Sequence, residues 1–330
     1  MTGVRRPGIG SGSARAFAQP LALDGLAPGG TSAGSRTRPK ADPGTGLSRR
    51  RALAAAGMLC TCPGLPLAQP GAAAPLREAP LRVALVPYLS PRAMLGQFEP
   101  LRVHLESALG RAVEFHTAPS FAALIEGVRR REQPFTLLPM HLARIAVADW
   151  GATLVVRSTR ESPVQLLTPR SLGLTRPEAL RGHTVAAIDP LSITALMLRR
   201  WLREKGLDGS VRVLHLPSAN AAAKALALGE VQAMSVAQGQ ALDIPWVRPD
   251  ALEVLGHLGQ VLTPCFVAHP EVPAAEVLAF RRAVLDFSAP ASMRGASGAA
   301  FVEPGARDLE PYEPFAEQAR RMLDESARRR

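Results

Sequence analysis

The stretch HTVAAIDPLSITALMLRRWLREK, residues 183–205, decides the fold class. An apolar run over residues 185–188 stops at Asp189 and Pro190, and a segment with apolar residues at helical spacing follows from Ser192. This order predicts a strand, a tight turn and a helix. The start of such a helix carries unsatisfied N–H groups and a partial positive charge, which favour an anion. An ordinary Ser N-cap explains the same residues, so the rest of the chain has to decide between the two.

The same alternation of strand and helix continues on both sides of this stretch. Strands are expected at residues 81–87, 112–116, 135–138, 153–158, 184–188, 211–216, 232–236 and 262–268. Helices are expected at residues 98–109, 120–131, 140–150, 176–180, 192–205, 219–228, 273–287 and 313–327. Short loops between strands and helices indicate parallel sheets that are covered by helices on both faces.

The alternation forms two series, which predict two doubly wound α/β lobes with a ligand cleft between them. One lobe is expected over residues 80–165 and 262–330, and the other over residues 170–258. Ligands of such sheets bind at the carboxyl ends of the strands. The start of the helix at residue 192 would therefore face the cleft.

The first 74 residues are expected to precede the folded part. Residues 1–47 are rich in Gly, Pro, Ser and Arg, which predicts a disordered extension, or a segment upstream of the true translation start. Residues 48–74 join three arginines (49–51) to a short apolar stretch, which is typical of a twin-arginine export signal. An arginine-rich tail with a chance apolar patch is the alternative. An export signal predicts a periplasmic protein.

Charge and cysteines narrow the function classes. Residues 1–68 hold nine Lys/Arg and two Asp/Glu, so they carry +7 of the formal net charge of +11. The remaining chain shows no basic stripe with interleaved aromatic residues, so no nucleic-acid partner is expected. Cys60 and Cys62 fall inside the signal, where a lipid anchor on Cys62 stays open, and Cys265 lies in an apolar run that predicts a buried strand.

Five blocks of sequence resemble one known family in the same order. They are LRVALVPYLSPRAMLGQFEPLRVHLESALGRAVEF (81–115), SFAALIEGVRRREQPFTLLPMHLARIA (120–146), LRGHTVAAIDPLSITALML (180–198), ALALGEVQAMSV (225–236) and TPCFVAHPEVP (263–273). The family is that of the phosphate/phosphite/phosphonate-type substrate-binding proteins of ABC importers, and the resemblance covers about residues 81–290. It implies the fold of the type 2 periplasmic binding proteins, which close by a hinge around their ligand.

The resemblance also implies site residues. Ser192 and Thr194 match two hydroxyl positions with which the family holds its ligand, whereas Ile193 and Ala195 replace the usual Thr and Gly. One side-chain donor is therefore missing, although the backbone N–H groups remain. The facing loops and the end of strand 232–236 complete the predicted ligand-binding set with Tyr88, Ser90, Ser120, His141 and Gln238. For His141 a structural role is an equal alternative, in which it lies in the first turn of a helix and pairs with solvent or with the backbone.

The ligand class is predicted from a further departure. Gln232 stands where the family has an Asp near the ammonium group of aminophosphonates, and without an acidic partner such a ligand loses a contact of about 1.5–3 kcal/mol. Phosphate, phosphite, a simple phosphonate or another small oxyanion therefore fits better than an aminoalkyl phosphonate. Asp243 lies close enough in sequence to weaken this inference.

Three functions follow, in descending order. The first is a monomeric binding protein that captures a small anionic ligand and docks on an ABC permease in the membrane. The second is the same fold as a sensor that partners a membrane histidine kinase. The third, remote alternative is an enzyme. It is disfavoured because the sequence has no nucleophile elbow, HExxH motif, P-loop or Cys/His cluster. No cofactor and no metal are expected.

Overall fold

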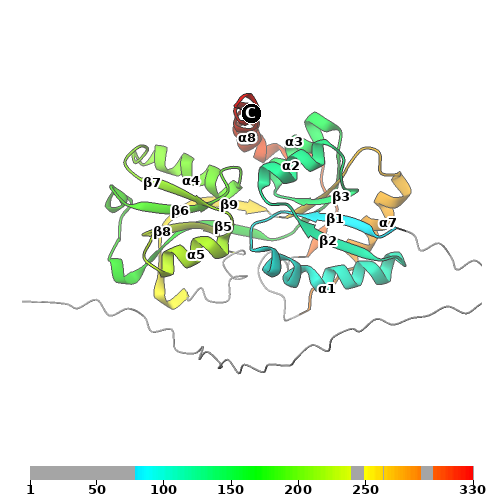
Figure 1. The fold of residues 1–330 in the computed structure, drawn as a ribbon, viewed down its shortest axis with the longest axis horizontal. Coiled ribbons are helices and arrows are strands. Elements are labelled where there is room, and N and C mark those ends of the chain that lie inside the picture. The colour runs from blue at the N-terminus through cyan, green and yellow to red at the C-terminus, as the bar shows by residue number, and fades with distance from the viewer. Residues whose placement is uncertain (1–78, 239–248, 263, 291–299, 330) are drawn as a thin grey trace, which may run out of the picture. The chain divides into compact units, whose positions relative to one another are not determined.

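The computed structural model describes residues 79–238, 249–262, 264–290 and 300–329. The predictions for residues 1–47 and 48–74 lie outside the described residues. Two sheets, one of six strands and one of five, organise the described chain (Figure 1). We call each sheet together with its covering helices a lobe, the six-stranded sheet forming the first lobe and the five-stranded sheet the second.

The first lobe is built on a sheet with the strand order β11-β4-β10-β3-β1-β2. Its strands are β1 (Leu81–Leu85), β2 (Val113–Thr117), β3 (Phe135–Leu138), β4 (Thr153–Ser158), β10 (Cys265–Ala268) and β11 (Phe301–Val302). Its helices are α1 (Pro91–Leu109), α2 (Phe121–Arg129), α3 (Met140–Trp150) and α7 (Ala274–Leu285). Helices α2 and α3 pack together over one face of the sheet and α1 packs with α7 on the other (Figure 1).

The second lobe is built on a sheet with the strand order β7-β6-β8-β5-β9. Its strands are β5 (Glu161–Pro169), β6 (Thr184–Ile188), β7 (Arg212–Leu216), β8 (Ala233–Ala237) and β9 (Leu252–Leu262). Helices α4 (Ile193–Glu204) and α5 (Ala219–Ala227) lie on opposite faces of this sheet (Figure 1). The C-terminal helix α8 (Glu313–Arg328) packs on α3 of the first lobe and on α4 of the second.

The two predicted α/β lobes are confirmed, and their sheets are mixed, with a parallel core and antiparallel strands. Strands β1, β2 and β3 are parallel to one another, as are β6, β7 and β8. In contrast, β10 pairs antiparallel with β3 and β4, and β5 pairs antiparallel with β8 and β9. The short strand β11 also pairs antiparallel, with β4. Strands β5 and β10 each lie directly after a passage of the chain from one sheet to the other.

Strands β5 and β9 were absent from the sequence prediction. Pro163 and Pro169 obscure β5, because proline interrupts the usual strand pattern. Both prolines lie outside Val164–Leu167, the part of β5 that pairs with β8 as well as with β9, so their missing N–H groups are tolerated. The strand predicted over residues 262–268 is in fact the end of β9 followed by β10.

Helix boundaries follow local chemistry with two exceptions. Helix α1 begins at Pro91 rather than at Phe98, so Pro100 lies inside it instead of at its start. Proline at the first position suits a helix start, and α1 has it at Pro91. The helix predicted over 176–180 is a short 3-10 helix, Pro177–Leu180. Cys265 is fully buried in β10, as its apolar neighbours predict.

Candidate functional site

The start of α4 is built as its sequence predicts. Ser192 is the N-cap, and its Oγ accepts a hydrogen bond of 3.2 Å from the backbone N–H of Ala195. The hydroxyl oxygens of Ser192 and Thr194 lie 3.3 Å apart, and both residues are 1% exposed. The backbone carbonyl of Thr194 accepts a hydrogen bond of 3.1 Å from the Ser235 hydroxyl on β8. The strand, turn and capped helix are thereby confirmed, with two hydroxyl groups buried at the helix start.

A small cavity of about 10 Å³ lies at this helix start. The first lobe lines it with Val86, Tyr88, Phe121 and Pro139, and the second with Ile188, Ser192, Ile193 and Thr194. Among the residues that the structure describes, no Lys or Arg lines this cavity. A group held here would therefore be bound by hydroxyl and backbone N–H groups, against an apolar wall to which Ile193 contributes.

Asp189 connects the lobes beside the cavity. Its Oδ2 accepts a hydrogen bond of 3.1 Å from the backbone N–H of Phe121, the first residue of α2. Its Oδ1 accepts one of 2.9 Å from the N–H of Leu191 in its own loop. In the sequence, Asp189 marks only the end of a predicted strand, although an Asp directly after a strand and before a helix start is a signal for a ligand site.

Two further hydrogen bonds join the lobes through neutral groups. The backbone N–H of Ala219, the first residue of α5, donates to the carbonyl of Tyr88 at 2.9 Å. The N–H of Ser90, which is the N-cap of α1, donates to Oδ1 of Asn220 at 2.9 Å. The predicted residues Tyr88 and Ser90 thus take part in contacts with the opposite lobe through their backbone groups.

His141 lies in the first turn of α3 and is fully buried. Its Nε2 lies 2.8 Å from the carbonyl oxygen of Leu191, the residue before the α4 N-cap. Burial lowers the pKa of His141 to about 4, although the hydrogen bond to Leu191 opposes this shift. The structure therefore places His141 as a neutral donor to the backbone, which was the alternative weighed for it, and not in the lining of the cavity.

Two predicted residues lie away from the cavity. Ser120 is the N-cap of α2, and its Oγ accepts a hydrogen bond of 3.1 Å from Ala123 N–H. Gln238 is exposed, one residue after β8. Neither belongs to the cavity lining.

The inference drawn from Gln232 has to be corrected. Its Oε1 accepts a hydrogen bond of 3.0 Å from the N–H of Thr184, the first residue of β6. Gln232 therefore sits at the amino end of the sheet, whereas the cavity is at the carboxyl end of β6. Its lack of charge says nothing about an ammonium group in the cleft, where Asp189 supplies a carboxylate. Asp243, the other acid considered, lies outside the described residues.

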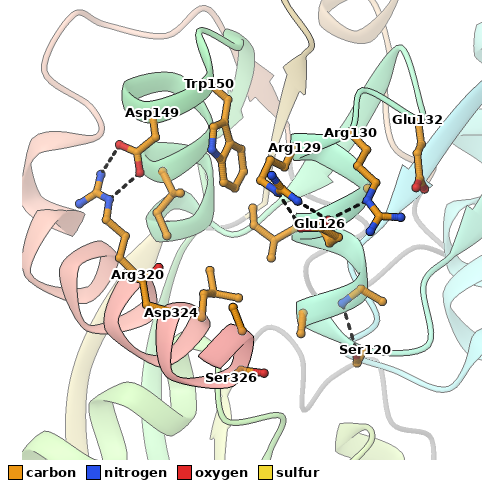
Figure 2. Close-up of a pocket in the computed structure, with 17 residues that line it drawn as sticks. Ser120, Glu126, Arg129, Arg130, Glu132, Asp149, Trp150, Arg320, Asp324 and Ser326 are labelled. Atoms are coloured by element: carbon orange, nitrogen blue, oxygen red, sulfur yellow. Dashed lines mark hydrogen bonds and ion pairs between the residues drawn. The ribbon is translucent and has the colours of Figure 1, made fainter. Parts of the chain in front are cut away.

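A larger groove of about 940 Å³ runs along the outer side of the first lobe, between α2, α3 and α8 (Figure 2). Arg320 binds Asp149 through two hydrogen bonds of 2.7 and 3.0 Å, and Arg129 and Arg130 both bind Glu126 (Figure 2). These charges are paired within the protein. The groove includes Ser120 but shares no lining residue with the cavity at the start of α4.

Metal-binding clusters and membrane-spanning helices can be assessed for residues 79–238, 249–262, 264–290 and 300–329. Those ranges contain no group of three or more His, Cys, Asp or Glu side chains that could hold a metal ion. Within them, no helix combines the length and apolar character that a membrane crossing needs.

Residues 83–309 match a family model that is described as "ABC transporter, phosphonate, periplasmic substrate-binding protein". A search of curated proteins finds no match. Solved structures show the same fold at low sequence identity.

One such structure is a binding-protein component of an ABC phosphonate transporter from Pseudomonas aeruginosa, with a TM-score of 0.62, 15% identity, and coverage of 74% of this chain and 88% of that one. Another is PhnD1 from Prochlorococcus marinus in complex with methylphosphonate, with a TM-score of 0.62, 11% identity, and coverage of 72% and 97%. A third is XAC2383 from Xanthomonas citri bound to ATP, with a TM-score of 0.57, 15% identity, and coverage of 74% and 98%.

Proposed function

Because the chain belongs to the family of periplasmic substrate-binding proteins of phosphonate ABC transporters, we propose that it captures a small oxyanion of the phosphate, phosphite or phosphonate class between its lobes and delivers it to an ABC permease. The observation that carries this proposal is the cavity at the start of α4. There Ser192 and Thr194 of one lobe meet Tyr88 and Phe121 of the other. Buried hydroxyl groups at a helix start are suited to bind an oxyanion.

The proposal includes export, since the family acts in the periplasm. Residues 48–74 would provide a twin-arginine signal, and a lipid anchor on Cys62 remains part of the hypothesis. The two lobes would close on the ligand as a monomer. The boundaries expected at residues 165 and 170 have to be corrected, because β5 begins at Glu161 and belongs to the sheet of the second lobe, as does β9 up to Leu262. The chain leaves the first sheet after Ser158 and enters the second at Glu161, which makes the segment at residues 159–160 the candidate hinge.

We assign direct ligand contact to Ser192, Thr194 and Tyr88. Ser90 and His141 would support the site through the backbone contacts that they make across the cleft. The proposal leaves out Ser120 and Gln238, because Ser120 caps α2 and Gln238 is exposed beyond β8. The described residues of the cavity lining include no Lys or Arg, so the affinity would rest on hydrogen bonds and helix N-termini.

The test is titration calorimetry of the full chain with methylphosphonate, phosphite, inorganic phosphate and sulfate. We expect binding of at least one phosphorus oxyanion, and loss of that binding in the double variant Ser192→Ala/Thr194→Ala. The Ser192 cap supports α4, so its loss also destabilises the protein by about 1 kcal/mol. The control therefore has to be a variant that loses a helix N-cap but keeps the ligand-binding residues.

Ser218→Ala is the matched control, because Ser218 caps α5 in the same lobe through a 3.2 Å hydrogen bond from Ala221 N–H. It should lose similar stability and retain most of its affinity. If the double variant binds as tightly as the wild type, the ligand lies elsewhere. If no phosphorus oxyanion binds to the wild-type chain, the proposed function is wrong.

A further inference from the structure

Asp189 places a carboxylate at the start of α2, whose first residue Phe121 lines the cavity. Among the described residues, its hydrogen-bond partners are two backbone N–H groups, Phe121 N at 3.1 Å and Leu191 N at 2.9 Å. Phe121 is the first residue of α2, a helix of nine residues. The N–H groups at a helix start have no partner within the helix and are a preferred place for an anion. Asp189 of the second lobe therefore serves as the anion for a helix of the first lobe.

The charge of Asp189 distinguishes it from the other cross-lobe acceptors around the cavity. The N–H of Ala219 reaches a carbonyl oxygen of Tyr88, and the N–H of Ser90 reaches the amide oxygen of Asn220. His141 donates to a carbonyl oxygen as well. These neutral acceptors resemble ordinary loop contacts. Asp189 alone among them presents the same chemical group that the cleft is proposed to capture, an oxygen anion.

The cavity volume makes the two anions exclusive. At about 10 Å³ the cavity between Phe121 and Ser192 has room for about one water molecule. A phosphorus oxyanion has at least four heavy atoms, so the lobes must separate to admit it. Separation pulls Asp189 in the second lobe away from Phe121 N–H in the first. The N–H of Phe121 is then free of the carboxylate and available to another acceptor.

We propose that Asp189 is a built-in competitor for the ligand, which must displace this carboxylate from the start of α2 before it can bridge the lobes. The inference rests on the proposed function and concerns its regulation. Two negative groups cannot share one N–H donor without repulsion, so ligand binding includes the loss of the contact between Asp189 and Phe121. The observed affinity is then lower than the cleft would give without this side chain.

The test is Asp189→Asn in the full chain, titrated with methylphosphonate and with inorganic phosphate. Asparagine retains the size of the side chain and an oxygen acceptor for Leu191 N–H, while it removes the charge. We expect the Kd of the variant to be about tenfold lower than that of the wild type, which equals ~1.4 kcal/mol. Small-angle scattering of the ligand-free variant should show a larger radius of gyration, because the charged contact that draws the lobes together is weaker.

Asp208→Asn is the matched control, since Asp208 is exposed in the same lobe and loses the same charge. It should bind like the wild type, and circular dichroism of both variants should match the wild type.

An unchanged or higher Kd in Asp189→Asn overturns the inference, and a higher Kd means that Asp189 positions the loop before α4. If wild-type binding depends on Ser192 and Thr194 but Asp189→Asn does not raise the affinity, the competitor role of Asp189 is wrong and the proposed function stands. If neither the wild type nor the variant binds an oxyanion, the proposed function fails with it.

Discussion

The imidazole Nε2 of His141 lies 2.8 Å from the carbonyl oxygen of Leu191, although the two residues are 50 positions apart and belong to different lobes. A carbonyl can only accept, so Nε2 carries the proton and Nδ1 of the neutral ring carries a lone pair. That Nδ1 is buried without a hydrogen-bond partner among the described residues. The contact fixes the backbone just before Ser192. His141 thereby links closure of the lobes to the position of the predicted anion-binding turn.

This burial makes stability depend on pH. The pKa of His141 is lowered to about 4 in the folded protein, from 6.5 in an exposed imidazole. Between these values the unfolded chain binds a proton that the folded protein does not. The free energy of unfolding therefore falls as pH decreases through this window, by on the order of 3 kcal/mol in total for this residue. Above pH 6.5 the contribution is fully present.

Urea unfolding at about pH 7 and about pH 5 tests this prediction. Burial also lowers the pKa of His116 and of His269, so those residues add to the same trend. The variant His141→Gln isolates one contribution, because glutamine retains a donor and cannot titrate in this range. Its loss of stability between the two pH values should be smaller than that of the wild type. Equal losses would contradict the assignment of a depressed pKa to His141.

The two Ser N-caps on opposite sides of the cleft should separate cleanly by mutation. Ser120→Ala removes the hydrogen bond from Ala123 N–H and should destabilise the protein by about 1 kcal/mol, with no change in ligand affinity. Ser192→Ala removes the equivalent bond from Ala195 N–H and should lose both stability and affinity. Thermal melts and calorimetry on the two single variants provide the comparison. A loss of affinity in Ser120→Ala would place that hydroxyl group back in the site.

The sequence predicted those features that depend on neighbouring residues. Helix α4 and its cap at Ser192 follow from a pattern of about a dozen positions, and so does the burial of Cys265. The contact of Asp189 with Phe121 spans 68 positions, so no local pattern could indicate it. Gln232 was misplaced for a different reason: the predicted strand 232–236 already put it at the amino end, whereas the ligand site lies at the carboxyl ends of the strands.

Close packing of β9 against α4 predicts a sensitive glycine. A Cβ added at Gly256 would lie 2.6 Å from Cζ2 of Trp201, which is itself buried. Gly256→Ala should therefore destabilise the protein by about 1–3 kcal/mol through overpacking. Gly96→Ala is the control, because a Cβ at Gly96 meets no atom within 4 Å and its site lies within helix α1. That control should be neutral or stabilising by up to about 1 kcal/mol.

A second substitution checks the cause of the effect at Gly256. Trp201→Phe removes the ring that contains Cζ2, so it should recover part of the stability that Gly256→Ala loses. The double-mutant cycle should then give a coupling of about 0.5–3 kcal/mol, as is usual for residues in contact. Strictly additive losses, measured by urea unfolding, would show that the clash is relieved by movement of β9 instead.

Helix α8 should contribute to closure of the lobes, because it contacts both. Its Arg320 is bound to Asp149 on α3, and its Phe315 lies under Arg200 of α4, with the guanidinium carbon 5.0 Å from the ring centroid. Arg200→Met retains the aliphatic stem and removes the cation, which loses about 0.5–1 kcal/mol of attraction. If this attraction acts only when the lobes are closed, the Kd for methylphosphonate should rise about two- to fivefold.

Arg203→Met, which removes an exposed charge from the same helix, should leave the Kd unchanged. Equal Kd values for the two variants would show that α8 holds α4 in open and closed arrangements alike.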